Sequence, residues 1–180
     1  MTRVFVGLEP PETLRTLLAL QQQLLPLPSR VAPETLHLTL VFGGEQPPSM
    51  LADIDDALRA IRSAPFELYL QGFGLFGGAR PRAVWAGVAP SPALGALQAR
   101  VAQALRGIGL SLPARRFVAH VTLGRFTPPP PDEAMRIERA VAEGSGFRAG
   151  PWPVHDMVLW ESRLSHRGAH YIELARYPLG

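Results

Sequence analysis

The chain has 180 residues, contains no cysteine and carries a formal net charge of +3, and all 18 of its basic residues are arginine. The lack of cysteine excludes disulfides, thiolate metal sites and a cysteine nucleophile. The modest basic excess is compatible with an anionic partner but does not require one. The length is typical of one domain, and we expect residues 1–180 to form a single domain.

The spacing of apolar residues predicts both strands and helices along the chain. Short β-branched or alternating stretches predict strands at residues 3–8, 36–42, 66–73, 83–88, 117–125, 156–163 and 170–177. Apolar residues at helical spacing, each run opened by proline or serine, predict helices from about 10 to 25, 49 to 61, 91 to 106 and 131 to 143.

The order of these elements nearly repeats in the second half of the chain. Each half carries one His-x-Thr strand that has a helix before it and a helix after it. The sequence therefore predicts an α+β fold with two similar lobes of antiparallel sheet and helices on the outer faces. We expect a pseudo-twofold axis to relate the lobes around a central cleft.

Two histidines stand in matching apolar surroundings, His37 in ETLHLTLVFGG and His120 in FVAHVTLGRF. In a strand, residues i and i+2 point to the same face. His37 and Thr39 therefore share a face, as do His120 and Thr122, while the residues between them point to a core. A pseudo-twofold axis would bring both polar pairs to one cleft.

Two imidazoles across a cleft are suited to general acid–base catalysis, because one can accept a proton while the other donates one. The neighbouring hydroxyls can donate hydrogen bonds to an anion, and a phosphodiester meets these requirements. Neither HExxH nor a third ligand at a suitable offset accompanies the motifs, so we predict no metal site.

The amino-terminal residues MTRVFVGLEPPETL do not look like a secretory signal, since their apolar run is short and interrupted by proline and glutamate. No run of eighteen apolar residues is present. We therefore expect a cytoplasmic protein without a membrane partner.

With its two His-x-Thr motifs, the chain resembles the 2H phosphoesterase superfamily. More narrowly, it resembles the RNA 2′,3′-cyclic phosphodiesterases, which are also called 2′-5′ RNA ligases. The resemblance includes RVFVGLEPP, PETLHLTLVFGG, FGLFGGARPRAVWAGV, RRFVAHVTLGRF and the terminal segment VLWESRLSHRGAHYIELARYPL, and thus nearly the whole chain. One departure is Ala119, where the family commonly has proline before the second histidine.

The resemblance implies hydrolysis of a 2′,3′-cyclic phosphate at an RNA end, which leaves a 2′-phosphate and needs no metal or other cofactor. It implies that His37 protonates the departing 3′-oxygen, that His120 activates water, and that Thr39, Thr122 and Arg125 bind the phosphate. The two histidine roles can be exchanged without conflict with the sequence. The expected partner is RNA with such an end, tRNA fragments included, and the expected state is a monomer without an obligate protein partner.

Further candidates lie near the motifs. Phe76 follows a strand and could stack on a nucleobase, while Arg115 and Arg116 could meet the RNA backbone or be solvated. Three alternatives stay open at this point. They are a 2′-5′ RNA ligase, a 2′-5′ phosphodiesterase acting on other nucleotides, and a catalytically inactive RNA-binding module.

Overall fold

A computed structural model describes residues 1–180 as one eight-stranded sheet with four α-helices and two short 3-10 turns. The strands are β1 (Thr2–Leu8), β2 (Leu38–Gln46), β3 (Phe66–Phe76), β4 (Ala83–Val88), β5 (His120–Arg125), β6 (Arg148–Val154), β7 (Asp156–Ser165) and β8 (Gly168–Pro178). The helices are α1 (Glu12–Leu24), α2 (Pro48–Arg59), α3 (Pro92–Gly107) and α4 (Pro131–Glu143).

The sheet consists of two four-stranded parts that meet at the strands carrying the motifs. Its order is β6-β3-β4-β5-β2-β1-β7-β8, and every neighbouring pair is antiparallel. We call β1, β2, β7 and β8 the terminal lobe, and β3 to β6 the central lobe. The join is narrow, because β2 and β5 pair only at Leu38 and Val121. A cleft can therefore open between the lobes beside the two motifs.

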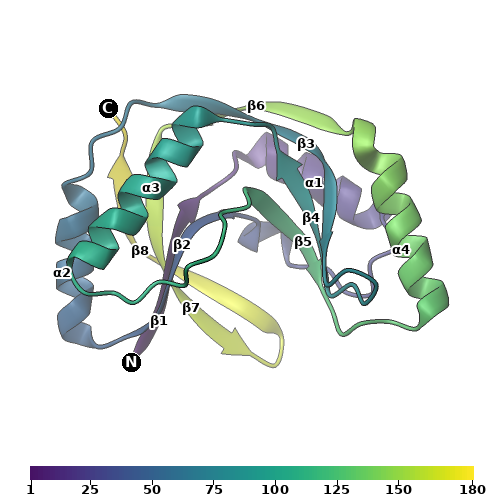
Figure 1. The fold of residues 1–180 in the computed structure, drawn as a ribbon, viewed down its shortest axis with the longest axis horizontal. Coiled ribbons are helices and arrows are strands. Elements are labelled where there is room, and N and C mark those ends of the chain that lie inside the picture. Colours follow the sequence, from purple (N-terminus) through teal and green to yellow (C-terminus); the bar gives the residue numbers. More distant parts are fainter.

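The helices divide between the two lobes. Helices α2 and α3 pack together and contact β8 and β2 of the terminal lobe, whereas α1 and α4 contact strands of the central lobe (Figure 1). The predicted α+β, bilobal, antiparallel architecture is thus confirmed. The lobes are not the two halves of the sequence, however. The chain builds the inner strands of the terminal lobe first, crosses to the central lobe, and returns at β7 to finish the terminal lobe.

Local sequence explains the helices. In α1 the buried side chains Leu14, Leu18 and Gln22 recur every four residues, which places them on one face. Proline occupies the first helical position of α2, α3 and α4, where its missing N–H costs nothing. The hydroxyl of Ser91 accepts a hydrogen bond from the Leu94 N–H and caps α3. None of the helices combines the length and the apolar character needed to cross a membrane.

The structure contains one strand that the sequence analysis did not predict. Strand β6 (RAGPWPV) contains two prolines, which disfavour a strand assignment because proline cannot donate a ladder hydrogen bond. The strand is tolerated because it lies at the edge of the sheet and pairs with β3 alone. The two motif strands also begin later than predicted, at Leu38 and at His120.

Gln22 is the one buried polar side chain of the core. Its amide donates 2.8 Å hydrogen bonds to the carbonyl oxygens of Val31 and Leu123. Helix α1 is thereby tied both to the segment that leads into the first motif and to β5, which carries the second. This side chain helps to hold the two motifs in one frame.

Candidate active site

The two histidines are held in the same way. The Nδ1–H of His37 donates to the carbonyl oxygen of Thr35 at 2.7 Å, and that of His120 donates to Val118 at 2.6 Å. A carbonyl oxygen can only accept, so the proton of each neutral ring sits on Nδ1 and Nε2 is a free acceptor. Nε2 of His37 lies 2.9 Å from the Thr39 hydroxyl, which donates to it, whereas Nε2 of His120 has no protein partner.

A β-bulge in each motif strand brings a later residue to the cleft face. The pairing of β2 with β1 skips Leu40, and the pairing of β5 with β4 skips Leu123, so the extra residue stands three positions after each histidine. A regular strand would turn a residue five positions after the histidine to the opposite face. Because of the bulges, Phe42 and Arg125 line the same cavity as His120.

Aromatic rings surround His37. Its ring centroid lies 4.7 Å from that of Phe5, 5.1 Å from Tyr171 in an edge-on arrangement, and 5.9 Å from Trp160. Gly7 makes room for this packing, since a Cβ there would lie 3.2 Å from the Trp160 ring. These contacts fix the imidazole plane and remove much of the ring from water.

His120 has a similar but more open surrounding. The ring of Phe76 meets it edge-on at 5.0 Å between centroids, and Trp85 lies 5.6 Å away. Trp85 lies across Gly74 of the neighbouring strand, where any Cβ would overlap the indole. Its buried Nε1 has no hydrogen-bond partner. A glycine on an adjacent strand therefore accommodates a tryptophan against each histidine.

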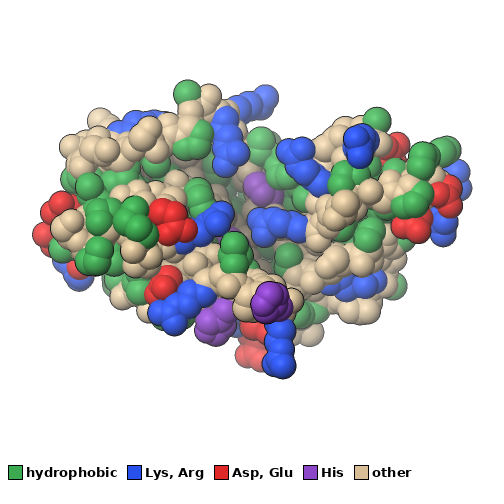
Figure 2. Space-filling view, turned by 90° about the horizontal axis from the view of Figure 1, so that it is seen from below, with side chains coloured by type: hydrophobic (Ala, Val, Ile, Leu, Met, Phe, Trp, Pro, Cys, Tyr) green, Lys and Arg blue, Asp and Glu red, His purple; other side chains and the backbone are tan.

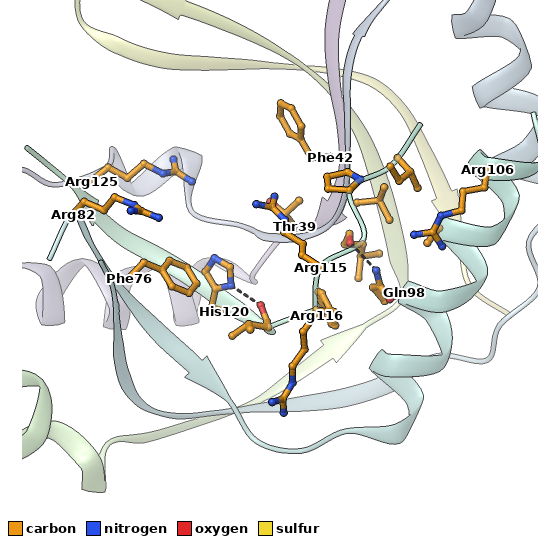
Figure 3. A pocket seen from close by; sticks show the side chains of 17 residues that line it. Thr39, Phe42, Phe76, Arg82, Gln98, Arg106, Arg115, Arg116, His120 and Arg125 are labelled. Atoms are coloured by element: carbon orange, nitrogen blue, oxygen red, sulfur yellow. Dashed lines mark hydrogen bonds between the residues drawn. The ribbon is translucent and has the colours of Figure 1, made fainter. Parts of the chain in front are cut away.

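A cavity of about 410 Å³ opens between the lobes beside His120. Its walls come from β2 and α3 on one side, from the ends of β3 and β5 on the other, and from the segment between α3 and β5 (Figure 3). Its charged lining residues are all arginines: Arg82, Arg106, Arg115, Arg116 and Arg125. Figure 2 shows basic side chains gathered around a hollow on this face of the molecule.

Burial, and after it the positive charges of the cleft, lower the pKa of both imidazoles. The pKa of His37 falls from 6.5 to about 4, chiefly through burial and further through the charges of Arg125 and His120, while the hydrogen bond to Thr35 opposes the shift. The pKa of His120 is also lowered, chiefly by burial and then by Arg125 and Arg115, against its hydrogen bond to Val118. Both rings are therefore neutral in the free protein at pH 7.

The residues predicted from the motifs come together only in part. Thr39, Phe76, His120 and Arg125 line the cavity. His37 does not line the cavity itself, but its Nε2 accepts a hydrogen bond from Thr39, which does. Thr122 lies in β5 opposite Trp85, outside the set of lining side chains, and its hydroxyl makes no hydrogen bond. Its role in phosphate binding remains a prediction.

Several lining residues had no signal strong enough to be singled out in the sequence. Phe42 stands five residues after His37, as Arg125 stands five after His120, and the repeat of the motif could have indicated it. Arg82, Gln98 and Arg106 reach the cavity only through the tertiary packing of β4 and α3. No group of three or more histidine, aspartate or glutamate side chains lies close enough together to hold a metal ion.

A bilobal α+β fold with two facing His-x-Thr strands defines the class of the 2H phosphoesterases. The chain matches the family model of the 2′-5′ RNA ligase superfamily over residues 7–165. The chain belongs to this superfamily, and the resemblance inferred from its motifs is confirmed.

Curated relatives and a solved structure agree with this membership. An RNA 2′,3′-cyclic phosphodiesterase of Geobacillus stearothermophilus is 34% identical over 159 residues, which are 86% of this chain and 49% of the relative, so the chain spans about half the length of that protein. The protein of the same name from Archaeoglobus fulgidus is 33% identical over 145 residues, or 80% of each chain. A crystal structure of a Thermus thermophilus protein has a TM-score of 0.79 at 26% identity and covers 98% of this chain and 97% of its own.

Proposed function

We propose that the chain hydrolyses the 2′,3′-cyclic phosphate at an RNA end to a 2′-phosphate, by acid–base catalysis between His37 and His120. One observation carries the proposal. Two histidines are anchored identically through Nδ1, and the charge of Arg125 lowers the pKa of both. His120 lines the arginine-rich cavity, and His37 is linked to it through Thr39, which also lines the cavity. Relatives of this chain bear the name of that activity.

In the proposed reaction, a water oxygen attacks phosphorus while Nε2 of His120 takes the proton of the water. The bond between phosphorus and the 3′-oxygen breaks, and Nε2 of His37 gives its proton to that oxygen. The product carries a phosphate on the 2′-oxygen and a free 3′-hydroxyl. The assignment of acid and base follows the family resemblance.

Binding of the anionic substrate lets the two histidines take up the one proton that this reaction needs. A bound phosphate places a negative charge beside both rings and offsets the charge of Arg125, which raises the pKa of an imidazole. The pair can therefore take up one proton together with the substrate. In this proposal Arg125 donates to a non-bridging oxygen, where charge develops in the transition state. The Thr39 hydroxyl does the same once Nε2 of His37 is protonated and no longer accepts from it. Phe76 lines the same cavity and is the candidate surface for the terminal base.

The pH profile of kcat/KM tests whether the two histidines share one proton, because kcat/KM reports the pKa values of the free enzyme. Catalysis needs one proton on the coupled pair, and both pKa values are lowered from 6.5. The pair loses this proton as the pH rises, so we expect kcat/KM to fall about tenfold per pH unit above roughly pH 6.5. The decline in kcat should lie at higher pH, because bound phosphate raises the pKa. A kcat/KM that stays flat up to about pH 8.5 would contradict the proposal.

The reaction itself is tested with a short RNA that ends in a 2′,3′-cyclic phosphate, in the presence of EDTA. We expect complete conversion to the 2′-phosphate, resolved from the 3′-phosphate by chromatography, at a rate that the chelator does not change. A parallel reaction containing an RNA with a 5′-hydroxyl end measures joining. A 3′-phosphate product, loss of turnover with EDTA, or a 2′-5′ joined strand as the main product would each refute the proposed hydrolysis.

A further inference from the structure

The arginines of the cleft differ from most other arginines of the chain in having no partner. None of the five that line the cavity hydrogen-bonds through its side chain to a carboxylate or to a backbone oxygen. Elsewhere, Arg15, Arg136, Arg163 and Arg176 each form an ion pair with a carboxylate. No acidic side chain lines the cavity, so none of its lining residues compensates the positive charge.

Like charges held together without counter-charges are unfavourable, and their field is visible in the site itself. Arg125 and Arg115 both lower the pKa of His120. The cleft arginines repel one another and lower the basicity of His120. A bound anion relieves both effects. The number of guanidinium groups then indicates how much negative charge the ligand brings.

Four of the five cleft arginines divide into two groups around His120, and Arg116 points away from both groups in Figure 3. Arg82 and Arg125 belong together, because Arg82 directly precedes Ala83, which pairs with Arg125 across β4 and β5. In Figure 3 they lie on the side of Phe76, whereas Arg115 projects toward Thr39 and Arg106 lies on α3 near Gln98. The Gln98 amide donates to the Leu40 carbonyl at 3.4 Å, which links this part of α3 to β2.

One phosphate does not account for both groups. The phosphate that reacts must lie between the two histidines, and Arg125 is the arginine whose charge lowers the pKa of both. Arg115 lowers the pKa of His120, and Arg106 lies on the α3 wall of the cavity, on the other side from Phe76, Arg82 and Arg125 (Figure 3). These two arginines therefore face a part of the cavity beyond the reacting group.

We propose that Arg106 and Arg115 bind a second phosphate of the substrate, the one on the 5′-oxygen of the terminal nucleoside. This inference rests on the proposed function and specifies its substrate class. The preferred substrate is then the end of an RNA strand, and a mononucleoside 2′,3′-cyclic phosphate, which lacks that phosphate, is a poor one.

The test compares two dinucleotides that both end in a 2′,3′-cyclic phosphate. One has a natural internal phosphate, and the other has an uncharged methylphosphonate in its place. We expect the natural compound to have a kcat/KM about 10- to 100-fold higher, as for loss of a charged hydrogen-bond partner. In the double variant Arg106→Gln/Arg115→Gln this ratio should fall close to one. Arg139→Gln is the matched control, because Arg139 is exposed on α4 without a side-chain partner, and it should keep the full ratio.

Salt dependence gives an independent measure. Loss of one phosphate contact on a single strand lowers the slope of log affinity against log salt concentration by about 0.7. We expect that decrease between the parent and the double variant on the natural dinucleotide, and no change for the methylphosphonate. A third compound, a 5′-phosphorylated mononucleoside cyclic phosphate, identifies the source of the phosphate. Equal rates for it and the natural dinucleotide would support the site and show that any 5′-phosphate suffices.

The outcomes separate the two proposals. If the parent opens both dinucleotides to the 2′-phosphate with equal kcat/KM, the second phosphate site is refuted while the proposed function stands. The second site is equally refuted if the double variant keeps the parent's ratio. If neither dinucleotide nor the mononucleotide is opened, the proposed function itself fails.

Discussion

Replacing either His37 or His120 with asparagine lowers kcat on a cyclic-phosphate RNA end by about 10²- to 10⁴-fold, the usual contribution of a positioned acid or base. Asparagine is chosen because its amide can still donate to the carbonyl that now accepts from Nδ1, at Thr35 or at Val118. The local backbone contact is therefore kept, and the titrating group is removed. Steady-state and single-turnover rates on the same RNA provide the measurement.

The control for this prediction is His155→Asn, since His155 is exposed and remote from the motifs in sequence. It should turn over substrate at the parent rate. The double variant should be less impaired than the product of the two single effects, because groups that act as a unit are not additive. Either single variant retaining more than about a tenth of the parent kcat would remove that histidine from the chemistry.

Replacing Arg125 with glutamine has the second largest expected effect. Loss of its charged hydrogen bond to the reacting phosphate should lower kcat/KM by about 10- to 100-fold. Its charge also lowers the pKa of both histidines, so its removal should raise both values. The decline of kcat/KM on the alkaline side should therefore move to higher pH. Arg125→Lys, which retains the charge, should keep the pH profile of the parent while losing bidentate geometry.

The two readouts of this variant separate a specific role from a general one. A lower kcat/KM with an unmoved pH profile would mean that Arg125 binds substrate but does not set the pKa of the histidines. Arg139→Gln removes the same charge from the exposed surface of α4 and should leave both readouts unchanged. If the control behaves like the Arg125 variant, net charge explains the effect and the assignment of Arg125 is wrong.

The sequence was enough to predict that the histidine and threonine of each motif share one face of a strand, because that prediction needs only the two-residue period of a strand. The hydrogen bond between Nε2 of His37 and Thr39 shows the expected shared face. The same period argues against Arg125, which stands at an odd offset from His120. A bulge at Leu123 reverses that expectation, and a bulge depends on pairing with β4, which a single strand does not reveal.

Long-range packing explains the remaining differences. The repeat of elements suggested two lobes made from two halves, whereas β7 and β8 complete the lobe that β1 and β2 begin. This crossing is encoded in strand partners far apart in sequence and not in local propensity. The aromatic surroundings of His37 are of the same kind, because Phe5, Trp160 and Tyr171 converge from three strands.

The central claim is that His37 and His120 form an acid–base pair with distinct roles, and sulfur substitution tests it most directly. In an RNA end whose cyclic phosphate is bridged by sulfur at the 3′ position, the leaving thiolate needs no proton, since a thiol has a pKa of only about 8.5. We predict that His37→Asn, impaired about 10²-fold or more on the oxygen substrate, turns over the sulfur substrate at nearly the parent rate. His120→Asn should stay impaired on both. Equal impairment of the two variants on the sulfur substrate, or rescue of His120→Asn instead, would contradict the account.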